Sequence, residues 1–432
     1  MQRRLTTDQT FECYAERMLK PLPRLEPSYY ETFRCVGAVC EDTCCRGWRV
    51  PVDKETYEKY QACSRPALGA KLYELVTINP VRASDEDYAE IALDNDACSF
   101  LTEGLCDIQS ALGEEYLSKS CATYPRAMYA VDGVLERSLD LSCPEAARLA
   151  LTNPHPMQFV ERTGEGDETR LGTVGIVDTT NSEHPDRPYS YVHEVRSLMI
   201  SLLQNRGYPI SQRLLALGRL CDKIEAEGTQ QGCGTLHEIT ERSVTIFPRP
   251  SMPAATRFEL AIELILARIG SDATGRRFLD CYQCFVDGLG WTMESTMDEL
   301  AERLDAAYSG PYARFVAQHE YVLENYLVAY VFKSLFPFGS ESVNRKLAEY
   351  RFAHSVSRQY QLMVANFVVI ETLLAGMAAF YGSRLGVPEA LKLIQSAAKT
   401  FEHSLSYPGK ALDLLVGKGL ADCASMSMLI RD

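Results

Sequence analysis

Hydrophobic residues recur every three or four positions through most of the second half of the chain, a spacing that predicts amphipathic helices. Clear examples are YVHEVRSLMISLLQNRG, RFELAIELILARIG and PEALKLIQSAAKTFEHSL, each bounded by glycine, proline or a polar turn. The longest apolar run, Val364 to Tyr381, is interrupted by Asn366, Glu371 and Thr372, which favours a buried helix over a membrane span. We therefore expect an all-α domain over residues 189–432 and no membrane partner.

The first third of the chain has a shorter, alternating pattern. In AMYAVDGVLERSLDLSC, apolar and polar residues alternate beside Asp132-Gly133, a strong signal for a β-hairpin. A second turn signal, Glu103-Gly104, lies in CSFLTEGLCDI. Cys143 precedes PEAARL, which predicts a helix that begins at the proline and has Cys143 as its N-cap. The expected fold is α+β and predominantly α, with short strands and hairpins in residues 1–151.

Residues 152–188 differ in composition and periodicity from the segments on either side. They contain NPHP, GEGDE and TTNSEHPDRP and show little periodicity. Clusters of this composition are typical of connecting segments at the surface. The pattern predicts two units joined by this connector.

Cysteine is the most informative residue type in this chain. Fifteen are present, and eight of them gather before the connector, at Cys35, Cys40, Cys44, Cys45, Cys98, Cys106, Cys121 and Cys143. No histidine precedes His155, so a metal here would be bound almost entirely through sulfur, as in zinc or iron–sulfur sites. The N-terminus has no apolar signal segment, which predicts a cytoplasmic protein, where clustered thiols hold metal more often than they pair.

The adjacent Cys44 and Cys45 bear on the kind of metal site. Neighbouring side chains on an extended backbone point in opposite directions, so both are awkward ligands for one tetrahedral ion. The pair is better suited to ligating a multi-iron cluster, or to a division in which one cysteine ligates and the other serves a second site or none. We therefore expect an iron–sulfur cluster, with zinc as the alternative. One centre or two are both compatible with eight thiols.

The remaining cysteines carry a weaker signal. Isolated free cysteines are common small core residues, and we interpret five of them in that way: Cys13, Cys63, Cys221, Cys233 and Cys423. Cys281 and Cys284 form a CxxC pair in a helical context with no second pair nearby, a weak indication of metal or redox use.

The charge balance narrows the choice of partner. The formal net charge is −14, and the acidic excess is present on both sides of residue 151. Such a chain repels phosphates and offers no basic run, so nucleic acid is not expected as a partner. A partner that presents lysines is compatible with this field.

Several segments together resemble the flagellin lysine N-methylases. They are CVGAVCEDTCCRGW, CSFLTEGLCDIQSALGEEYLSKSC, TYPR, ERSLDLSCPEAARL and, in the second half, LENYLVAYVFKSLFPFG. The similarity covers most of the chain and is weakest across the connector. Those methylases belong to a wider group with a zinc- or iron-chelating CxxCxxCC domain, from which this chain departs by having four and three residues in the two gaps.

The resemblance implies an enzyme of the bacterial flagellum that transfers methyl groups from S-adenosylmethionine to lysine ε-amines of flagellin. It also implies that the eight clustered cysteines chelate the metal. No GxGxG-type loop follows a strand and opens a helix, so an ordinary Rossmann methyltransferase is not visible.

Candidate side chains for this chemistry lie near the cysteines in sequence. A tyrosine or carboxylate would serve as the base that deprotonates the lysine, and the candidates are Tyr124, Glu136 and Asp140. For the methyl donor we expect Trp48 to offer cation–π contact and Arg126 or Arg137 to bind the carboxylate. Structural roles in packing and ion pairing are the alternative for each of them.

Two other classes of function stay open at this point. The thiolates would form a structural metal site in a non-enzymatic interaction module, or they would themselves handle zinc or an iron–sulfur cluster. A deep pocket beside the cysteines would favour the enzyme, and a closed metal site without a cavity would favour the module.

Overall fold

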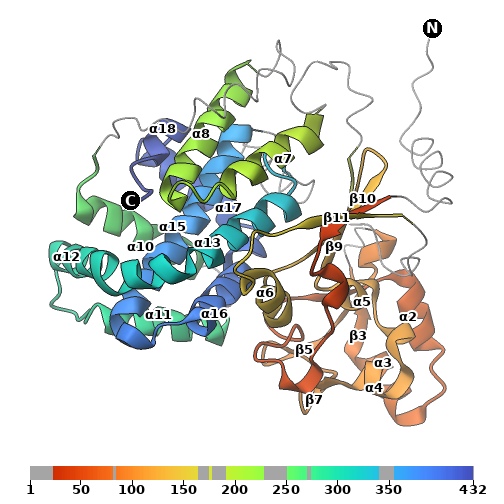
Figure 1. Cartoon of the computed structure of the whole chain (residues 1–432). Coiled ribbons are helices and arrows are strands. Elements are labelled where there is room, and N and C mark those ends of the chain that lie inside the picture. Colours follow the sequence, from red (N-terminus) through yellow and green to blue (C-terminus); the bar gives the residue numbers. More distant parts are fainter. Residues whose placement is uncertain are drawn as a thin grey trace, which may run out of the picture.

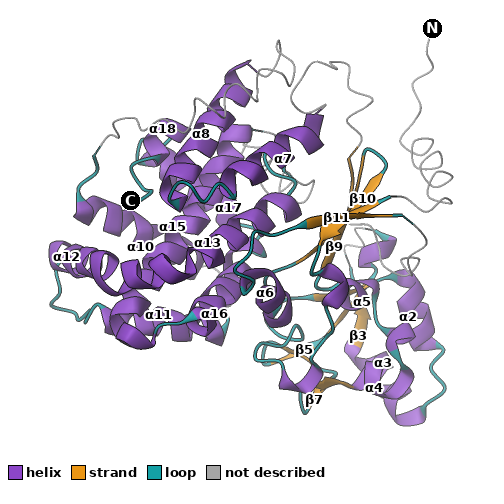
Figure 2. Cartoon of the chain, viewed as in Figure 1, coloured by secondary structure: helices purple, strands orange, loops and turns teal. Residues whose placement is uncertain are grey.

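The computed structural model describes residues 23–80, 84–163, 175–177, 191–227, 251–269, 274–339 and 355–431. The chain is a mixed α+β protein dominated by helices, with small sheets in its N-terminal part and an all-α C-terminal part (Figure 2). The predicted fold class is therefore confirmed. We call residues 1–151 the cysteine module and residues 189–432 the helical half.

The largest sheet has five strands in the order β11-β1-β10-β9-β12. Their bounds are Phe159–Arg162, Arg24–Pro27, Val134–Leu139, Arg126–Val131 and Gly175–Val177. Strands β9 and β10 form the predicted hairpin, in which Val131 pairs with Val134. Its two turn residues, Asp132 and Gly133, have φ values of 48° and 84°, the left-handed conformation that Asp-Gly turns provide.

Two strands of this sheet come from the segment that the sequence marks as a connector. Strand β11 pairs antiparallel with β1, and β12 pairs parallel with β9. The described parts of residues 152–188 thus extend the sheet of the cysteine module. The rest of that segment, 164–174 and 178–188, lies outside the described residues, and the boundaries of the two units remain a prediction.

A smaller subdomain of the cysteine module carries most of its thiols. Strands β2 (Val50–Val52), β4 (Ala89–Ile91) and β3 (Val76–Ile78) form an antiparallel sheet. Two-stranded ribbons follow, β5 (Leu93–Asp94) with β6 (Ala97–Cys98) and β7 (Leu101–Thr102) with β8 (Leu105–Cys106), together with helices α2 (Lys54–Gln61), α3 (Pro66–Leu75), α4 (Asp107–Leu112) and α5 (Lys119–Thr123). Val52, Leu72 and Phe100 lie at the centre of a separate small core.

The helical half is built around one long buried helix, α15 (Val356–Tyr381). Within the described residues of this half, the other helices are α7 (Val192–Leu203), α8 (Ile210–Glu227), α10 (Ala254–Ile269), α11 (Arg276–Gly288), α12 (Met297–Ala307), α13 (Ala313–Lys333), α16 (Val387–Ala397), α17 (Tyr407–Gly417) and α18 (Cys423–Met426). By length and composition α15 would suffice to cross a membrane, but 94% of its most apolar window is buried inside the protein. It is the core helix of the bundle, as its interrupting polar residues predicted.

The core of the helical half continues into the cysteine module. Helix α6 (Pro144–Leu151) buries Ala147 and Leu151 against this core, and Tyr129 and Val131 of β9 join it. Figure 1 shows α6 between the helices and the thiol-bearing subdomain. Burying each large apolar side chain contributes roughly 1.5–3 kcal/mol, so this continuity firmly docks the two parts.

Candidate functional site

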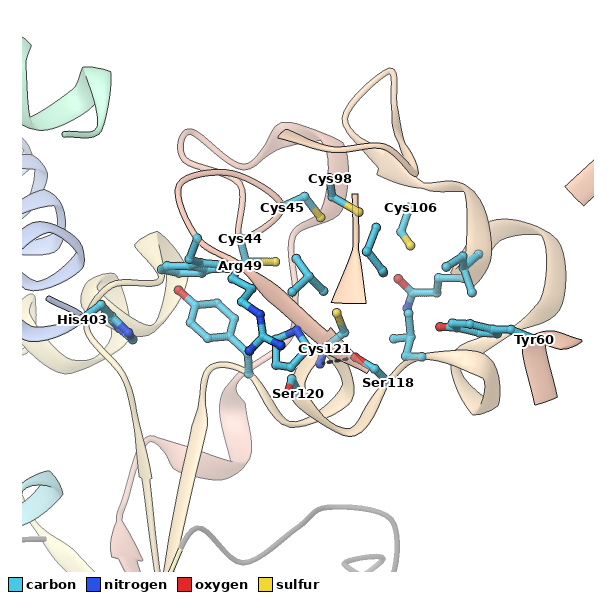
Figure 3. Close-up of a pocket in the computed structure, with 18 residues that line it drawn as sticks. Cys44, Cys45, Arg49, Tyr60, Cys98, Cys106, Ser118, Ser120, Cys121 and His403 are labelled. Carbon is cyan, nitrogen blue, oxygen red and sulfur yellow. Dashed lines mark hydrogen bonds between the residues drawn. The ribbon is translucent and has the colours of Figure 1, made fainter. Parts of the chain in front are cut away.

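A cavity of about 340 Å³ lies in the cysteine module where it faces the helical half. Five of the eight clustered cysteines line it: Cys44, Cys45, Cys98, Cys106 and Cys121. Figure 3 shows the sulfur atoms of Cys45, Cys98, Cys106 and Cys121 around this cavity and His403 at the end nearest the helical half. The cavity therefore brings together side chains that are as far apart in the sequence as Cys44 and His403.

Tight turns deliver these thiols to the cavity. The two-residue turn Asn95-Asp96, with φ values of 47° and 63°, folds β5 onto β6 and places Cys98 at the end of β6. The predicted Glu103-Gly104 turn does the same for Cys106 at the end of β8. The backbone N–H of Cys98 donates to the carbonyl of Cys45 at 2.8 Å, which fixes the Cys45 loop against the first ribbon.

Four thiols influence one another electrostatically. Partial desolvation raises the pKa of Cys121, an exposed residue, to about 12, and Cys45, Cys106 and Cys98 raise it further. Burial raises the pKa of Cys98 to about 11, with Cys45 and Cys106 again contributing. Burial also raises the pKa of Cys106, and Cys45 adds to it. Cys45, Cys98, Cys106 and Cys121 are therefore one neighbourhood, which we call the pocket thiols.

Cys35, Cys40 and Cys143 form a second neighbourhood. Burial raises the pKa of Cys143 to about 11, and Cys40 and Cys35 raise it further. Cys143 is the N-cap of α6 and Pro144 is its first residue, as predicted. The N–H groups of Ala146 and Glu145 at the helix N-terminus act in the opposite direction and lower the pKa of Cys143, but burial outweighs them.

The adjacent pair Cys44-Cys45 stands between the two neighbourhoods. The Cys44 thiol donates to Cys45, and together with Lys399 this lowers the pKa of Cys45 to about 6 although burial opposes it. The hydrogen bond to Cys45 and burial raise the pKa of Cys44, and Cys121 and Cys35, one from each neighbourhood, raise it further. Divided roles for the pair, one of the two possibilities open from sequence, match this arrangement. As the thiols lie, no three histidine, cysteine or acidic side chains among the described residues are grouped to hold a metal ion.

Aromatic side chains from both parts of the protein line the other end of the cavity. The ring of Trp48 lies 5.3 Å from that of Tyr124 and 5.1 Å from the imidazole of His403, measured between centroids. The ammonium of Lys399 lies 5.0 Å from the Trp48 ring centroid and 2.7 Å from Asp42. Trp48 thus lines the cavity and also packs against the small core of the cysteine module, and its contact with a donor stays a prediction.

A hydrogen-bonded chain runs from the cavity wall into the protein. The Tyr124 hydroxyl lies 3.0 Å from Ser142 Oγ, which lies 3.1 Å from His403 Nε2. His403 Nε2 is also 3.3 Å from Asp140 Oδ1, and Lys333 Nζ donates to Asp140 Oδ2 at 2.9 Å. Burial alone would raise the pKa of Asp140, but Lys333 and His403 hold it well below its usual range. Burial and the negative charge of Asp140 raise the pKa of Tyr124 well above its usual range.

Four of the predicted catalytic and donor-binding residues do not line this cavity: Asp140, which is linked to it through Ser142 and His403, and Glu136, Arg137 and Arg126. Glu136 is buried against Arg196 and His193 on α7. Arg137 is buried in ion pairs with Glu26 and Glu31 and lies over the Tyr30 ring. Arg126 stacks on Phe33 at 5.2 Å. Glu136 and Arg137 are neighbours on β10, so strand alternation directs them to opposite faces of the sheet, each of which is covered.

Sequence reasoning missed several residues at the cavity. Arg49 and His403 line it, while Ser142 and Lys399 contact the lining residues Tyr124 and Trp48. Lys399 and His403 are brought there by a π-helical turn, Ala398–Glu402, that follows α16, and π-helical turns often occur at functional sites. The one local signal is the polar run KTFEH after an amphipathic helix. Arg49 is neutralised by Asp87 and Glu90, so it is not a free cation of the cavity.

The cysteines outside the cluster behave as expected where they are described. Cys221 and Cys423 are buried, and Cys63 is half-buried against the small core. Cys13 and Cys233 lie outside the described residues. Cys281 is buried and Cys284 is half-buried on α11. Every cysteine in the described ranges is a free thiol.

The fold and the cavity define a predominantly helical α+β protein with a thiol-lined pocket where its two parts meet. Residues 196–429 match the FliB lysine N-methylase C-terminal domain. This match covers more than half of the chain, which therefore belongs to the FliB lysine N-methylase family. The matched residues include His403, Lys399 and Lys333 but none of the clustered cysteines.

Individual relatives agree with this assignment. The chain is 32% identical over 148 residues to the lysine-N-methylase of Salmonella choleraesuis (strain SC-B67) and 31% identical over 148 residues to that of Salmonella typhimurium (strain LT2). Each match covers 34% of this chain and 36% of the relative, so the chain spans about a third of the length of these methylases. The flagellar biosynthetic protein FliU of Salmonella muenchen is 31% identical over 147 residues, which are 33% of this chain and 86% of that protein. No solved structure matches the chain.

Proposed function

We propose that this protein is a lysine N-methyltransferase that moves a methyl group from S-adenosylmethionine to lysine ε-amines of flagellin. The observation that carries the proposal is the cavity itself, which has thiols at one end and Trp48, Tyr124 and His403 at the other. Its volume, about 340 Å³, is within the range of small-molecule sites. A cavity beside the cysteines is the feature that favours an enzyme over a closed metal-binding module. Family membership and the relationship to a flagellar biosynthetic protein support the reaction and the partner.

The aromatic end of the cavity suits a methyl donor and a lysine, because both carry positive charge. Cation–π attraction to Trp48 and Tyr124 would hold a sulfonium or an ammonium near the ring faces. The amine needs only to lose its proton and to lie in line with the methyl group, which the donor has already activated. Of the candidate bases and donor-binding residues, Trp48 and Tyr124 line the cavity, and Asp140 is linked to it through Ser142 and His403. Glu136, Arg126 and Arg137 would reach the cavity only by leaving their present partners.

We also propose that the clustered thiols hold iron–sulfur clusters, with zinc as the alternative. Cys45, Cys98, Cys106 and Cys121 would hold one centre, and Cys35, Cys40, Cys44 and Cys143 the other. We favour a cluster over a single ion because the pocket thiols surround a cavity. When bound, such a cluster would supply positive charge that deprotonates its thiols and fixes the loops that frame the cavity.

Purified protein, loaded with iron and sulfide without oxygen, tests the proposal in a mixture with donor and unmodified flagellin. Mass spectrometry should find increments of one methyl on flagellin lysines. The variant Trp48→Ala should bind the donor weakly and methylate slowly. The control is His155→Ala, which changes an exposed residue outside the cavity. Loaded protein that binds donor and leaves flagellin unmodified would exclude this substrate. Protein that binds no donor would exclude the enzyme and favour a metal-binding module.

A further inference from the structure

The proposed reaction requires a proton acceptor, and of the three predicted bases Glu136 lies away from the cavity while neither Tyr124 nor Asp140 suffices alone. A lysine side chain has an ordinary pKa of about 10.4, so it reaches the site as an ammonium ion at neutral pH and must first lose a proton. Burial and Asp140 raise the pKa of Tyr124 well above its usual range, which disfavours a phenolate. Asp140 is a poor acceptor, because Lys333 and His403 hold its pKa well below the usual range despite burial.

Resting on the proposed methyl transfer, we infer that His403 receives the proton that the target lysine loses, through the hydroxyl groups of Tyr124 and Ser142. Tyr124 and His403 both line the cavity. The steps are 3.0 Å from Tyr124 OH to Ser142 Oγ and 3.1 Å from Ser142 Oγ to His403 Nε2, each within hydrogen-bond range. The cysteine module therefore supplies the two hydroxyls, and the helical half supplies the acceptor.

The proton and electron changes balance along this chain. The lysine N–H bond breaks as Tyr124 accepts that proton and gives its own to Ser142, which in turn protonates His403 Nε2. The freed nitrogen lone pair then attacks the methyl carbon of the donor, and the carbon–sulfur bonding pair returns to sulfur, which leaves as a neutral thioether. The product is a methylated ammonium. The His403 side chain is 37% exposed, so the imidazolium can return its proton to solvent.

The surroundings of His403 suit a residue that gains positive charge. Asp140, 3.3 Å from Nε2, is kept in place by the backbone N–H of Ser142 at 2.9 Å and by Lys333 at 2.9 Å. This carboxylate would stabilise the imidazolium as it forms, while Glu402 shares the charge of Lys333. The Trp48 ring, with its centroid 5.1 Å from that of the imidazole, also packs against His403. We assign Asp140 as a positioning residue, because it acts through His403.

Steady-state kinetics of His403→Ala test this role. We expect kcat to fall roughly 100-fold or more, as for loss of a general base, while the KM for flagellin and the donor Kd from calorimetry change less than about 3-fold. Imidazole added to the assay should restore part of the lost rate of His403→Ala. It should not change the rate of the control, His155→Ala. Near-ultraviolet circular dichroism establishes that the variant is folded.

A second acceptor separates proton removal from a structural role. A flagellin peptide with S-(2-aminoethyl)cysteine in place of lysine has a more acidic ammonium, which needs less help to lose its proton. The deficit of His403→Ala should therefore be smaller with this peptide than with lysine. Equal deficits without rescue by imidazole, or a wild-type rate in His403→Ala, would overturn the role of His403 and leave the proposed function standing. A wild-type protein that methylates no lysine would instead refute the proposed function itself.

Discussion

Replacing Lys333 by methionine should destabilise the protein strongly, because this lysine neutralises two carboxylates where the helical half meets the cysteine module. Its Nζ lies 2.9 Å from Asp140 and 2.5 Å from Glu402, and the three side chains are 13%, 17% and 12% exposed. Removing one partner of a buried ion pair leaves uncompensated charge and typically costs about 3–5 kcal/mol. We expect a loss of this size in the free energy of unfolding at pH 7.

The pH dependence gives this prediction a sign. Folding lowers the pKa of Asp140, so its contribution is present above about pH 4 and is lost as the pH falls. Burial alone would lower the pKa of Lys333, but Asp140 and Glu402 raise it, so its contribution is present below about pH 10.4 and is lost at higher pH. The penalty of Lys333→Met should therefore be full at pH 7 and shrink toward pH 4, where the stranded carboxyl groups take up protons.

Urea unfolding of the wild type and Lys333→Met at pH 7 and pH 4.5 measures the effect. The matched control is Lys392→Met, which removes a lysine 3.3 Å from Asp280 in a pair whose side chains are 30% and 52% exposed. Such surface pairs contribute about 0–1 kcal/mol. Equal losses in the two variants, or a loss in Lys333→Met that does not change with pH, would refute the reasoning.

Three further predictions concern the thiols, the aromatic wall and the core. Cys45→Ser should lower both the content of bound iron and sulfide and the melting temperature. Cys63→Ser, which changes a half-buried thiol of the same module, should leave these quantities unchanged. Iron and sulfide analysis and thermal melting measure the two effects. Trp48→Ala should raise the donor Kd about 2- to 30-fold by calorimetry, with Trp48→Phe closer to the wild type. Burial raises the pKa of Glu371 to about 7, although Tyr312 donates a hydrogen bond to this carboxyl group. Ionisation of Glu371 therefore destabilises the fold as the pH rises from about 4.5 to 7. In urea unfolding, Glu371→Gln should be more stable than the wild type at pH 8 and differ little from it at pH 4.

Local features of the fold could be predicted from the sequence, because neighbouring residues decide them. The Asp132-Gly133 turn selects a hairpin through its backbone conformation, and Cys143-Pro144 begins a helix because proline suits the first helical position. The helical half follows from its apolar periodicity in the same way.

The composition of the cavity could be predicted only in part, because distant segments complete it. Trp48 and His403 lie in contact although 354 positions separate them, and no local pattern pairs them. Glu136 illustrates the opposite error. It is close to Cys143 in sequence, but alternation along β10 turns it toward Arg196 on α7. Proximity in sequence to the cysteines was therefore a poor guide to which polar residues reach the cavity.

The fate of a single methyl group tests the central claim most directly. Protein loaded with iron and sulfide would be incubated with S-adenosylmethionine that carries a deuterated methyl group and with flagellin from cells that lack the modification. Tandem mass spectrometry should locate the deuterated methyl on lysine side chains of flagellin, at a rate that falls in Trp48→Ala and His403→Ala and is unchanged in His155→Ala. Label that stays with the donor while the protein binds that donor, or equal transfer by all of these variants, would contradict the assignment of this cavity as the site of lysine methylation.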